Sequence, residues 1–239
     1  MMRRKRRGCG CLFLFVPILV IALVLGFYYY QGMKVNIDSL QDIQNEKTYV
    51  AASNMPDYVK NAFIAVEDKR FYQHDGVDWL GTGRALVISL KNGEASQGGS
   101  TITQQLVKNY FFNNEKSISR KLKEIVVAKR IENNYSKDQI LSYYLSSIYF
   151  GDNIYNIEQA ANTYFGTTTY MNGYRPQITV LQSAILASVI NAPSNYHAEN
   201  FAADTALQTR TKNTLDKMLE QKLITQMQYD AAVAGIPVN

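Results

Sequence analysis

Residues 67–78 read Glu67-Asp68-Lys69-Arg70-Phe71-Tyr72-Gln73-His74-Asp75-Gly76-Val77-Asp78. In the run before them, which begins near Met55-Pro56, Val59, Phe63 and Val66 recur at helical spacing. Glu67 is therefore expected at the end of a buried helix face, where the helix gives way to a loop. Burial there would raise the pKa of its carboxyl group toward a value that suits a general base. The alternative is a solvated loop with ordinary surface charges, and this stretch alone does not separate the two.

The rest of the chain predicts a mainly α-helical domain without alternating strands or internal repeats. Asn54 is expected to cap the first helix, with Pro56 in its first turn. Ser136-x-x-Gln139 has the pattern of a capping box and opens a helix that is expected to end at Phe150-Gly151. Apolar spacing predicts further helices over residues 79–90, 117–134, 158–165, 178–190, 203–221 and 225–234.

The helix over residues 117–134 is expected to bury one apolar stripe and to expose a charged face. Ile118, Leu122, Ile125 and Val126 form the predicted core stripe. Arg120 and Glu124 lie on a different face, four residues apart, with Lys121 and Lys123 nearby. This charged face is either a surface ion pair of little energetic value or a second carboxylate that Arg120 holds in place.

A second segment whose residue types suit ligand binding runs from Gly98 to Asn109. Two glycines and hydroxyl residues precede a helix-forming run, a pattern that presents free helix N–H groups to anions. Gln105, Lys108 and Asn109 share one face of that helix, where amides suit sugar hydroxyls and a cation suits phosphate. The spacing is not that of a nucleotide-binding P-loop. An ordinary capped amphipathic helix is the alternative.

Composition excludes several classes of function. The chain has 239 residues, enough for one sizeable domain and an appendage. Cys9 and Cys11 are the only cysteines, and His74 and His197 the only histidines, so no disulfide framework and no histidine-rich metal centre is expected. The net charge of +5 is carried by five basic residues at positions 3–7, and the remainder sums to zero. No nucleic-acid partner is expected, because the domain lacks a basic field.

The N-terminus has the composition of a membrane anchor. No charged residue lies between Gly8 and Met33, and residues 11–30 are long enough to cross a bilayer as a helix. The basic cluster before this run predicts a cytoplasmic N-terminus and an extracytoplasmic domain. A cleaved signal peptide is the alternative, but no small-residue cleavage pattern follows the run. The expected division is a basic tail over 1–10, a span over 11–30, a linker over 31–53 and the domain over 54–239.

Five ordered blocks resemble the peptidoglycan glycosyltransferases of glycosyltransferase family fifty-one, most closely the monofunctional, membrane-anchored staphylococcal type. The blocks cover residues 67–74, 98–109, 120–124, 140–151 and 160–166. The resemblance implies a bilobal, lysozyme-like fold with a small hydrophobic jaw lobe near the membrane. It also implies polymerisation of lipid II into linear glycan, with inversion at the donor carbon and release of undecaprenyl pyrophosphate. Moenomycin is expected to inhibit it, and no transpeptidase domain is expected.

The resemblance also assigns candidate site residues. Glu67 matches the family's general base, and Glu124 matches its second cleft carboxylate. Lys116 stands where close relatives carry an arginine, so its charge is kept but a bidentate grip on pyrophosphate is lost. Ser146 and Lys69 also depart from the usual residues of the family. The other positions that match substrate-binding residues of the family are Asp68, Phe71, His74, Arg84, Thr101, Gln105, Lys108, Asn109, Arg120, Lys121 and Lys123.

The implied chemistry needs one base and several cations. The leaving pyrophosphate requires positive charge more than a proton, and Lys108, Lys116, Arg120 and Lys123 are the candidates. No metal site is evident and no cofactor is obligatory, although Mg²⁺ or Mn²⁺ could assist. Expected partners are lipid II with the growing glycan and the bacterial cytoplasmic membrane, with other cell-wall synthases as further candidates. The alternatives are a lytic lysozyme-like enzyme and an inactive membrane-anchored protein that binds glycan or acts as a scaffold.

Overall fold

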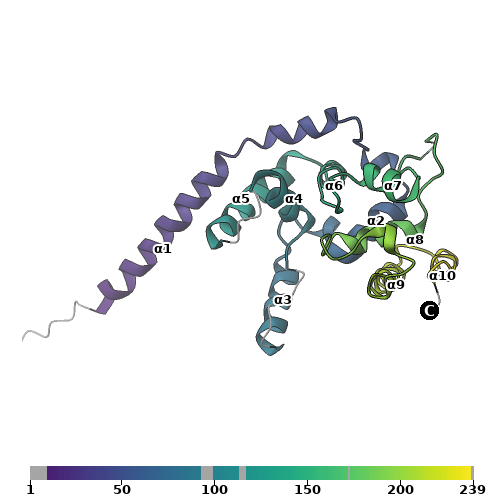
Figure 1. Cartoon of the computed structure of the whole chain (residues 1–239). Helices are drawn as coiled ribbons and strands as arrows, with labels where there is room; N and C mark the ends of the chain where they lie inside the picture. The colour runs from purple at the N-terminus through teal and green to yellow at the C-terminus, as the bar shows by residue number, and fades with distance from the viewer. Residues whose placement is uncertain (1–9, 93–98, 113–116, 172, 238–239) are drawn as a thin grey trace, which may run out of the picture.

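The computed structural model describes residues 10–92, 99–112, 117–171 and 173–237, and these residues form helices joined by short loops (Figure 1). No strand occurs among them, only two isolated bridges. This confirms the mainly α-helical prediction. In chain order the elements are α1 Gly10–Met33, η1 Ile37–Asn45, η2 Ala52–Asn54, α2 Asp57–Glu67, η3 Phe71–Gln73, α3 Trp79–Asn92, α4 Ile102–Phe111, α5 Ile118–Asn134, α6 Lys137–Leu145, α7 Ile157–Phe165, α8 Val180–Val189, η4 Ala198–Asn200, α9 Thr205–Glu220 and α10 Gln226–Ala234.

Local sequence signals set most helix starts. In a capping box, a hydroxyl at the N-cap and a glutamine three residues later satisfy two free backbone N–H groups. The predicted box at Ser136 and Gln139 opens α6, but the helix ends at Leu145 and not at Phe150-Gly151 as predicted. Gly166 ends α7 in the left-handed conformation, with φ 65°, that glycine adopts without strain. The same capping box opens α4, α8 and α10 at Thr101, Thr179 and Thr225.

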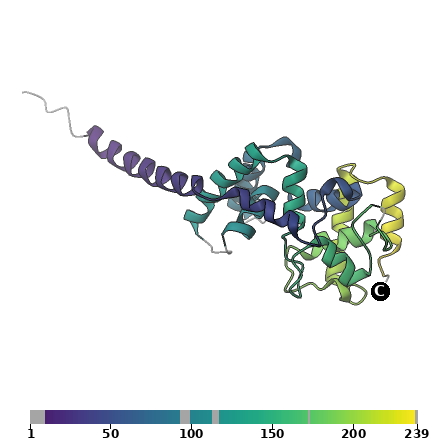
Figure 2. The ribbon, with the colours of Figure 1, turned by 90° about the horizontal axis from the view of Figure 1, so that it is seen from above.

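The helices pack in two groups. One group contains α2, α8, α9 and α10, and the other contains α4, α5 and α6. Seen from above, the second group lies nearer the membrane-anchor helix α1, and α9 and α10 lie at the far end (Figure 2). Glu67 ends α2 and so lies where the first group meets the loop that leads to α3 and α4. The arrangement agrees with the expected bilobal, lysozyme-like fold.

Helix α1 has the length and apolar composition of a membrane span. Only 6% of its most apolar window is buried inside the protein, so it is not a core helix. Its C-terminal end packs on α5, where a Cβ atom at Gly32 would lie 2.8 Å from Cβ of Val126. Arg130 Nη1 donates to the carbonyl oxygens of Gly32 and Val35, both at 2.8 Å. The end of the span is thus held to the folded domain.

The predicted linker is part of the folded domain. Ile37, Leu40 and Ile43 of η1 are buried, as are Val50 and Ala52. The prediction that the domain starts at residue 54 places its boundary too late. The polar residues between the apolar ones concealed a short helix, with an apolar residue every third position, that covers one side of the core.

Two other predictions from local pattern are wrong. Helix α2 is capped by Pro56, and Asn54 instead ends the short helix η2. In α5 the buried residues are Glu124, Val127, Ala128 and Ile131. The predicted stripe is partly or fully exposed, with Ile118 at 83%. The stripe was misassigned because the buried face of this helix carries a charge, whereas apolar residues such as Val126 lie toward α1.

Helix α3 projects from the rest of the domain (Figure 1). Trp79, Leu80 and Val87 on this helix are all at least 65% exposed. Large apolar side chains gathered on a projecting helix are unusual for a surface that meets only water. The helix therefore has the character expected of the jaw lobe.

Candidate active site

Glu67 lies in a cleft of about 340 Å³. The walls come from the end of α2, the first turns of α3, the loop at Gly99–Thr101 and the last turns of α9. The predicted site residues Asp68, Arg84 and Thr101 also line this cleft. The stretch 67–78 therefore contributes to a concave site, as the functional interpretation of the sequence required, and it is not a plain solvated loop.

Burial raises the pKa of the Glu67 carboxyl group above its ordinary value of 4.5. A hydrogen bond from Gln105 opposes this effect, as do the positive charges of Arg210, Lys217 and Lys108. The group therefore combines a raised pKa with neighbours that keep its ionised form accessible. A carboxylate in this environment is suited to take a proton from a hydroxyl group near neutral pH.

One amide bridges the carboxylate and a buried tyrosine. Gln105 Nε2 donates to Oε2 of Glu67 at 2.7 Å. The hydroxyl of Tyr144 donates to Oε1 of Gln105 at 3.2 Å. Tyr144 is fully buried in α6, so the carboxylate on α2 is connected through α4 to the protein core.

Asp68 and His74 pair with each other in the loop that follows Glu67. Nε2 of His74 lies 2.9 Å from Oδ2 of Asp68, and the same oxygen accepts from the backbone N–H of Ile102 at 3.0 Å. Thr101 caps α4 and donates from Oγ1 to the carbonyl of Gly76 at 2.7 Å. These contacts fix the N-terminus of α4 against the loop after Glu67.

Three of the predicted substrate-binding residues, Asp68, Phe71 and His74, also have a structural role in the loop after Glu67. Phe71 is completely buried, and its ring lies edge-on to those of Tyr72 and His74. The side chains of His74 and Asp68 are 8% and 3% exposed and are occupied by each other. The three residues hold the loop through these contacts, and Asp68 also lines the cleft.

Glu124 is buried and paired with two cations. Its carboxylate lies 2.9 Å from Nε of Arg120 and 3.2 Å from Nζ of Lys121. Lys121 also donates to Oγ of Ser100, which lines the cleft. The ion pair is therefore not a surface pair of little value. It is a buried carboxylate that orders two cations beside the cleft.

Lys108 interacts through its charge with both carboxylates, Glu67 and Glu124. Burial and the nearby charge of Arg120 lower the pKa of its ammonium group, while Glu124 and Glu67 oppose that shift. Gln105 and Lys108 belong to the same helix α4, three residues apart, as the sequence predicted. Lys108 of the second sequence block therefore interacts with Glu67 of the first block and with Glu124 of the third.

The paired and buried residues above leave five predicted or noted positions. Of these, the ones on α3, α4 and α5 are more exposed to solvent. Arg84 is exposed on α3, and Asn109 on α4 is partly exposed. Lys123 Nζ lies 5.1 Å from the ring centre of Phe112, a cation–π contact that ties α5 to the end of α4. Lys116 lies outside the described residues. Ser146 is buried at the C-terminus of α6 and does not line the cleft.

Two cations of α9 were not predicted from the sequence. Arg210 and Lys217 both lower the pKa of Glu67 through their charges, and Lys217 lines the cleft. Arg210 is held by a hydrogen bond from Nε to the carbonyl of Ser188 and lies over the ring of Tyr196. Their separation of seven residues on an amphipathic helix places them on one face, which is the signal that could have found them.

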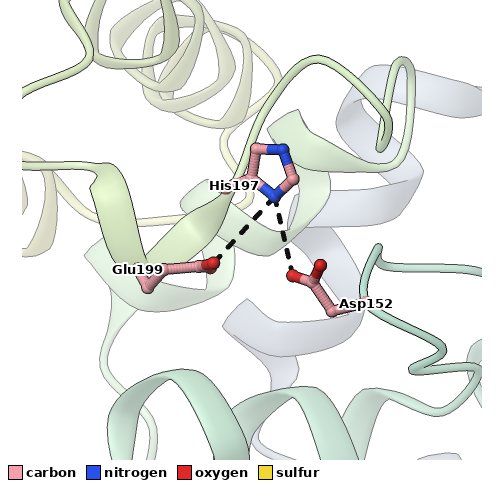
Figure 3. Close-up of side chains that lie close together, drawn as sticks. All are labelled: Asp152, His197 and Glu199. Atoms are coloured by element: carbon pink, nitrogen blue, oxygen red, sulfur yellow. Dashed lines mark ion pairs between the residues drawn. The ribbon is translucent and has the colours of Figure 1, made fainter.

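One group in the described part of the chain has the residue types of a metal site (Figure 3). Nδ1 of His197 lies 3.5 Å from Oδ2 of Asp152 and 3.9 Å from Oε1 of Glu199. All three side chains are more than a third exposed, and none lines the cleft beside Glu67. Exposed groups of this kind are common without a bound ion, so the arrangement by itself assigns no metal to the site.

Comparison with known proteins agrees with this geometry. The transglycosylase family model matches residues 34–219. A protein named monofunctional glycosyltransferase from Staphylococcus haemolyticus (strain JCSC1435) is 48% identical over 235 residues, which cover 98% of this chain and 86% of that protein. A protein of the same name from Staphylococcus aureus (strain Newman) is 49% identical over 215 residues, covering 90% of this chain and 79% of that protein. The chain belongs to the transglycosylase family.

Proposed function

We propose that the protein is a peptidoglycan glycosyltransferase that polymerises lipid II into linear glycan strands, with inversion at the donor anomeric carbon. The observation that carries the proposal is the cleft in which Glu67, a carboxyl group of raised pKa, faces several cations. A weak sugar nucleophile needs the base, and a pyrophosphate leaving group needs the cations. Both requirements are met by residues of the same cleft region.

Glu67 takes the proton of the attacking 4-hydroxyl of N-acetylglucosamine. The hydroxyl oxygen then bonds to the donor anomeric carbon as the bond to the pyrophosphate oxygen breaks, and the configuration inverts. No covalent enzyme intermediate is required. Of the supporting residues, Gln105 orients the base, and Asp68, Phe71, His74 and Thr101 hold the loop and helix that carry it.

The developing charge on the pyrophosphate is stabilised by cations of α4 and α5. Lys108, Arg120 and Lys123 are assigned this role, and Lys116 and Arg84 extend it toward the donor. Glu124 orders Arg120 and Lys121, since it is paired with both. A divalent cation such as Mg²⁺ or Mn²⁺ could bind the pyrophosphate itself and add to the same stabilisation. No step requires it.

The membrane brings both substrates to the cleft. Lipid II and the growing glycan are tethered to the bilayer, so an enzyme anchored through α1 works at high local substrate concentration. The basic residues before α1 support a cytoplasmic N-terminus and a domain outside the cytoplasmic membrane. The exposed apolar residues of α3 contact the lipid surface beside the cleft. Other cell-wall synthases are candidate partners.

A lytic, lysozyme-like activity is the second candidate, because a carboxyl group of raised pKa also suits a general acid. The neighbouring cations disfavour it. Lys108, Arg210 and Lys217 all favour the ionised form of Glu67, whereas a general acid must stay protonated. Release of soluble muropeptides from purified cell wall would support the lytic alternative.

The decisive experiment is polymerisation of labelled lipid II by the detergent-solubilised protein. We expect glycan polymer from the wild type, inhibition by moenomycin, and a rate at least about 100-fold lower for Glu67→Gln. Glu220→Gln is the matched control, because Glu220 is a carboxylate that lines the same cleft from α9. Full activity of Glu67→Gln would remove the base assignment. Absence of polymer from the wild type would favour a glycan-binding or scaffold role.

A further inference from the structure

We propose that Tyr144 is a positioning residue that sets the orientation of the Gln105 amide and thereby keeps the catalytic base Glu67 ionised. The inference rests on the proposed function, because it concerns how the base of that reaction is maintained. Tyr144 lies on α6, Gln105 on α4 and Glu67 at the end of α2, so three elements meet in one hydrogen-bonded chain.

The chain of contacts is directional. A glutamine side chain has an accepting oxygen and a donating NH₂ group, and either can face a given neighbour. A tyrosine hydroxyl can donate to the amide oxygen or accept from the NH₂ group, whereas an ionised carboxylate can only accept. When Tyr144 donates to Oε1 of Gln105, Nε2 must turn toward Glu67, as observed at 2.7 Å. A reversed amide would place an oxygen against the carboxylate and favour its protonated form.

The hydroxyl of Tyr144 is a dependable donor. Burial raises the pKa of this group well above its ordinary value of 10.0, and the charges of Glu67 and Asp68 raise it further. The hydroxyl therefore stays protonated throughout the pH range in which an enzyme of this kind is assayed. Its hydrogen therefore remains available to the amide oxygen of Gln105.

Other charged groups around Glu67 do not replace this contact. Lys108 from α4 and Arg210 and Lys217 from α9 favour the ionised carboxylate through their charges. The contact with Gln105 is the largest of the effects that lower the pKa of Glu67. The orientation of one amide is therefore expected to have a measurable influence on the ionisation of the base.

The test compares Tyr144→Phe with Tyr143→Phe in the full-length, detergent-solubilised protein. Both tyrosines are fully buried neighbours on α6, but the hydroxyl of Tyr143 accepts a hydrogen bond from Gln44 at 2.5 Å instead of contacting the site. We expect the acid limb of kcat against pH to move upward by about one pH unit in Tyr144→Phe. The rate should recover at higher pH, KM should stay unchanged, and Tyr143→Phe should keep the wild-type profile.

A second readout does not depend on activity. Glutamate labelled with ¹³C at its carboxyl carbon allows Glu67 to be titrated by NMR, with its signal assigned by its loss in Glu67→Gln. The Glu67 signal of Tyr144→Phe should titrate at higher pH than that of the wild type. Superimposed titration curves and pH profiles, with only a lower Tm, would overturn the proposal and leave Tyr144 a packing residue. A shifted titration in a protein that makes no polymer would contradict the proposed function alone.

Discussion

The two carboxylates of the site, Glu67 and Glu124, are both largely buried, but different groups contact them. Glu67 receives one amide hydrogen bond, and its positive neighbours act from a distance. Glu124 is in direct contact with Arg120 and Lys121. Burial raises the pKa of the Glu67 carboxyl group, whereas the structure shows Glu124 in contact with two cations. The two carboxylates thus differ in the group that contacts them, an amide for Glu67 and cations for Glu124, and this difference agrees with the separate roles proposed for them.

The largest effect is expected from Arg120→Ala, which leaves Glu124 buried beside Lys121 alone. Breaking a buried ion pair from one side costs about 3 kcal/mol of stability. Thermal unfolding followed by circular dichroism measures it. Lys129→Ala on the same helix is the control, because its pair with Asp75 is exposed and its loss should change stability little. Equal losses in the two variants would contradict the distinction between buried and exposed pairs on α5.

Lys108→Gln removes the cation that acts on both carboxylates. We expect the polymerisation rate to fall about 100-fold, a typical result of removing one group that stabilises developing charge. The acid limb of the pH profile should also move upward, because Lys108 favours the ionised form of Glu67. Lys108→Arg should restore most of the rate if charge alone matters. A profile unchanged in position would separate Lys108 from the base.

Glu67→Gln should change the pH dependence of stability. The pKa of Glu67 is raised on folding, so between 4.5 and its folded value the native state holds a proton that the unfolded state has lost. Wild-type stability is therefore reduced as pH rises through this window and the reduction is constant above it. The Tm of Glu67→Gln relative to wild type should rise across the same window. The reverse slope would mean that the folded protein lowers this pKa.

The smallest effect is expected from Gly32→Ala, which acts where the end of α1 packs on α5. The new Cβ would lie 2.8 Å from Cβ of Val126, so α1 and α5 must separate slightly. We expect a loss of about 1 kcal/mol in stability and little change in the acid limb set by Glu67. Adding Val126→Ala should recover the stability only in part, because alanine keeps the Cβ atom and removes only the contact with Cγ1 at 2.9 Å. A large shift of the acid limb would show that the anchor also acts on the base.

Local signals in the sequence predicted the helices well. Capping boxes and terminal glycines act within one turn, so Ser136 and Gly166 mark helix ends without knowledge of the fold. The buried face of α5 could not be predicted from apolar periodicity, because Glu124 occupies it. Its burial depends on the positive charges of Arg120 and Lys121, which offset the cost of burying a carboxylate. Apolar periodicity takes no account of such pairing.

The candidate site was predicted only where its residues fall in short blocks. Glu67, Gln105 and Glu124 belong to such blocks, and the structure places them around Lys108. Arg210 lies far along the chain from Glu67 in a helix with no distinctive motif, and only folding brings its charge into play. The buried state of Phe71 likewise depends on packing that no local pattern reveals.

The hydrogen bonds from Arg130 to the end of α1 couple the orientation of the membrane span to that of the domain. A helix of 24 residues is about 36 Å long, longer than a hydrocarbon core of about 30 Å, and such a helix tilts to fit. Because Arg130 holds the carbonyl groups of Gly32 and Val35, a change in tilt turns α5 with it. Bilayer thickness would then set the angle at which the cleft faces its lipid-bound substrates.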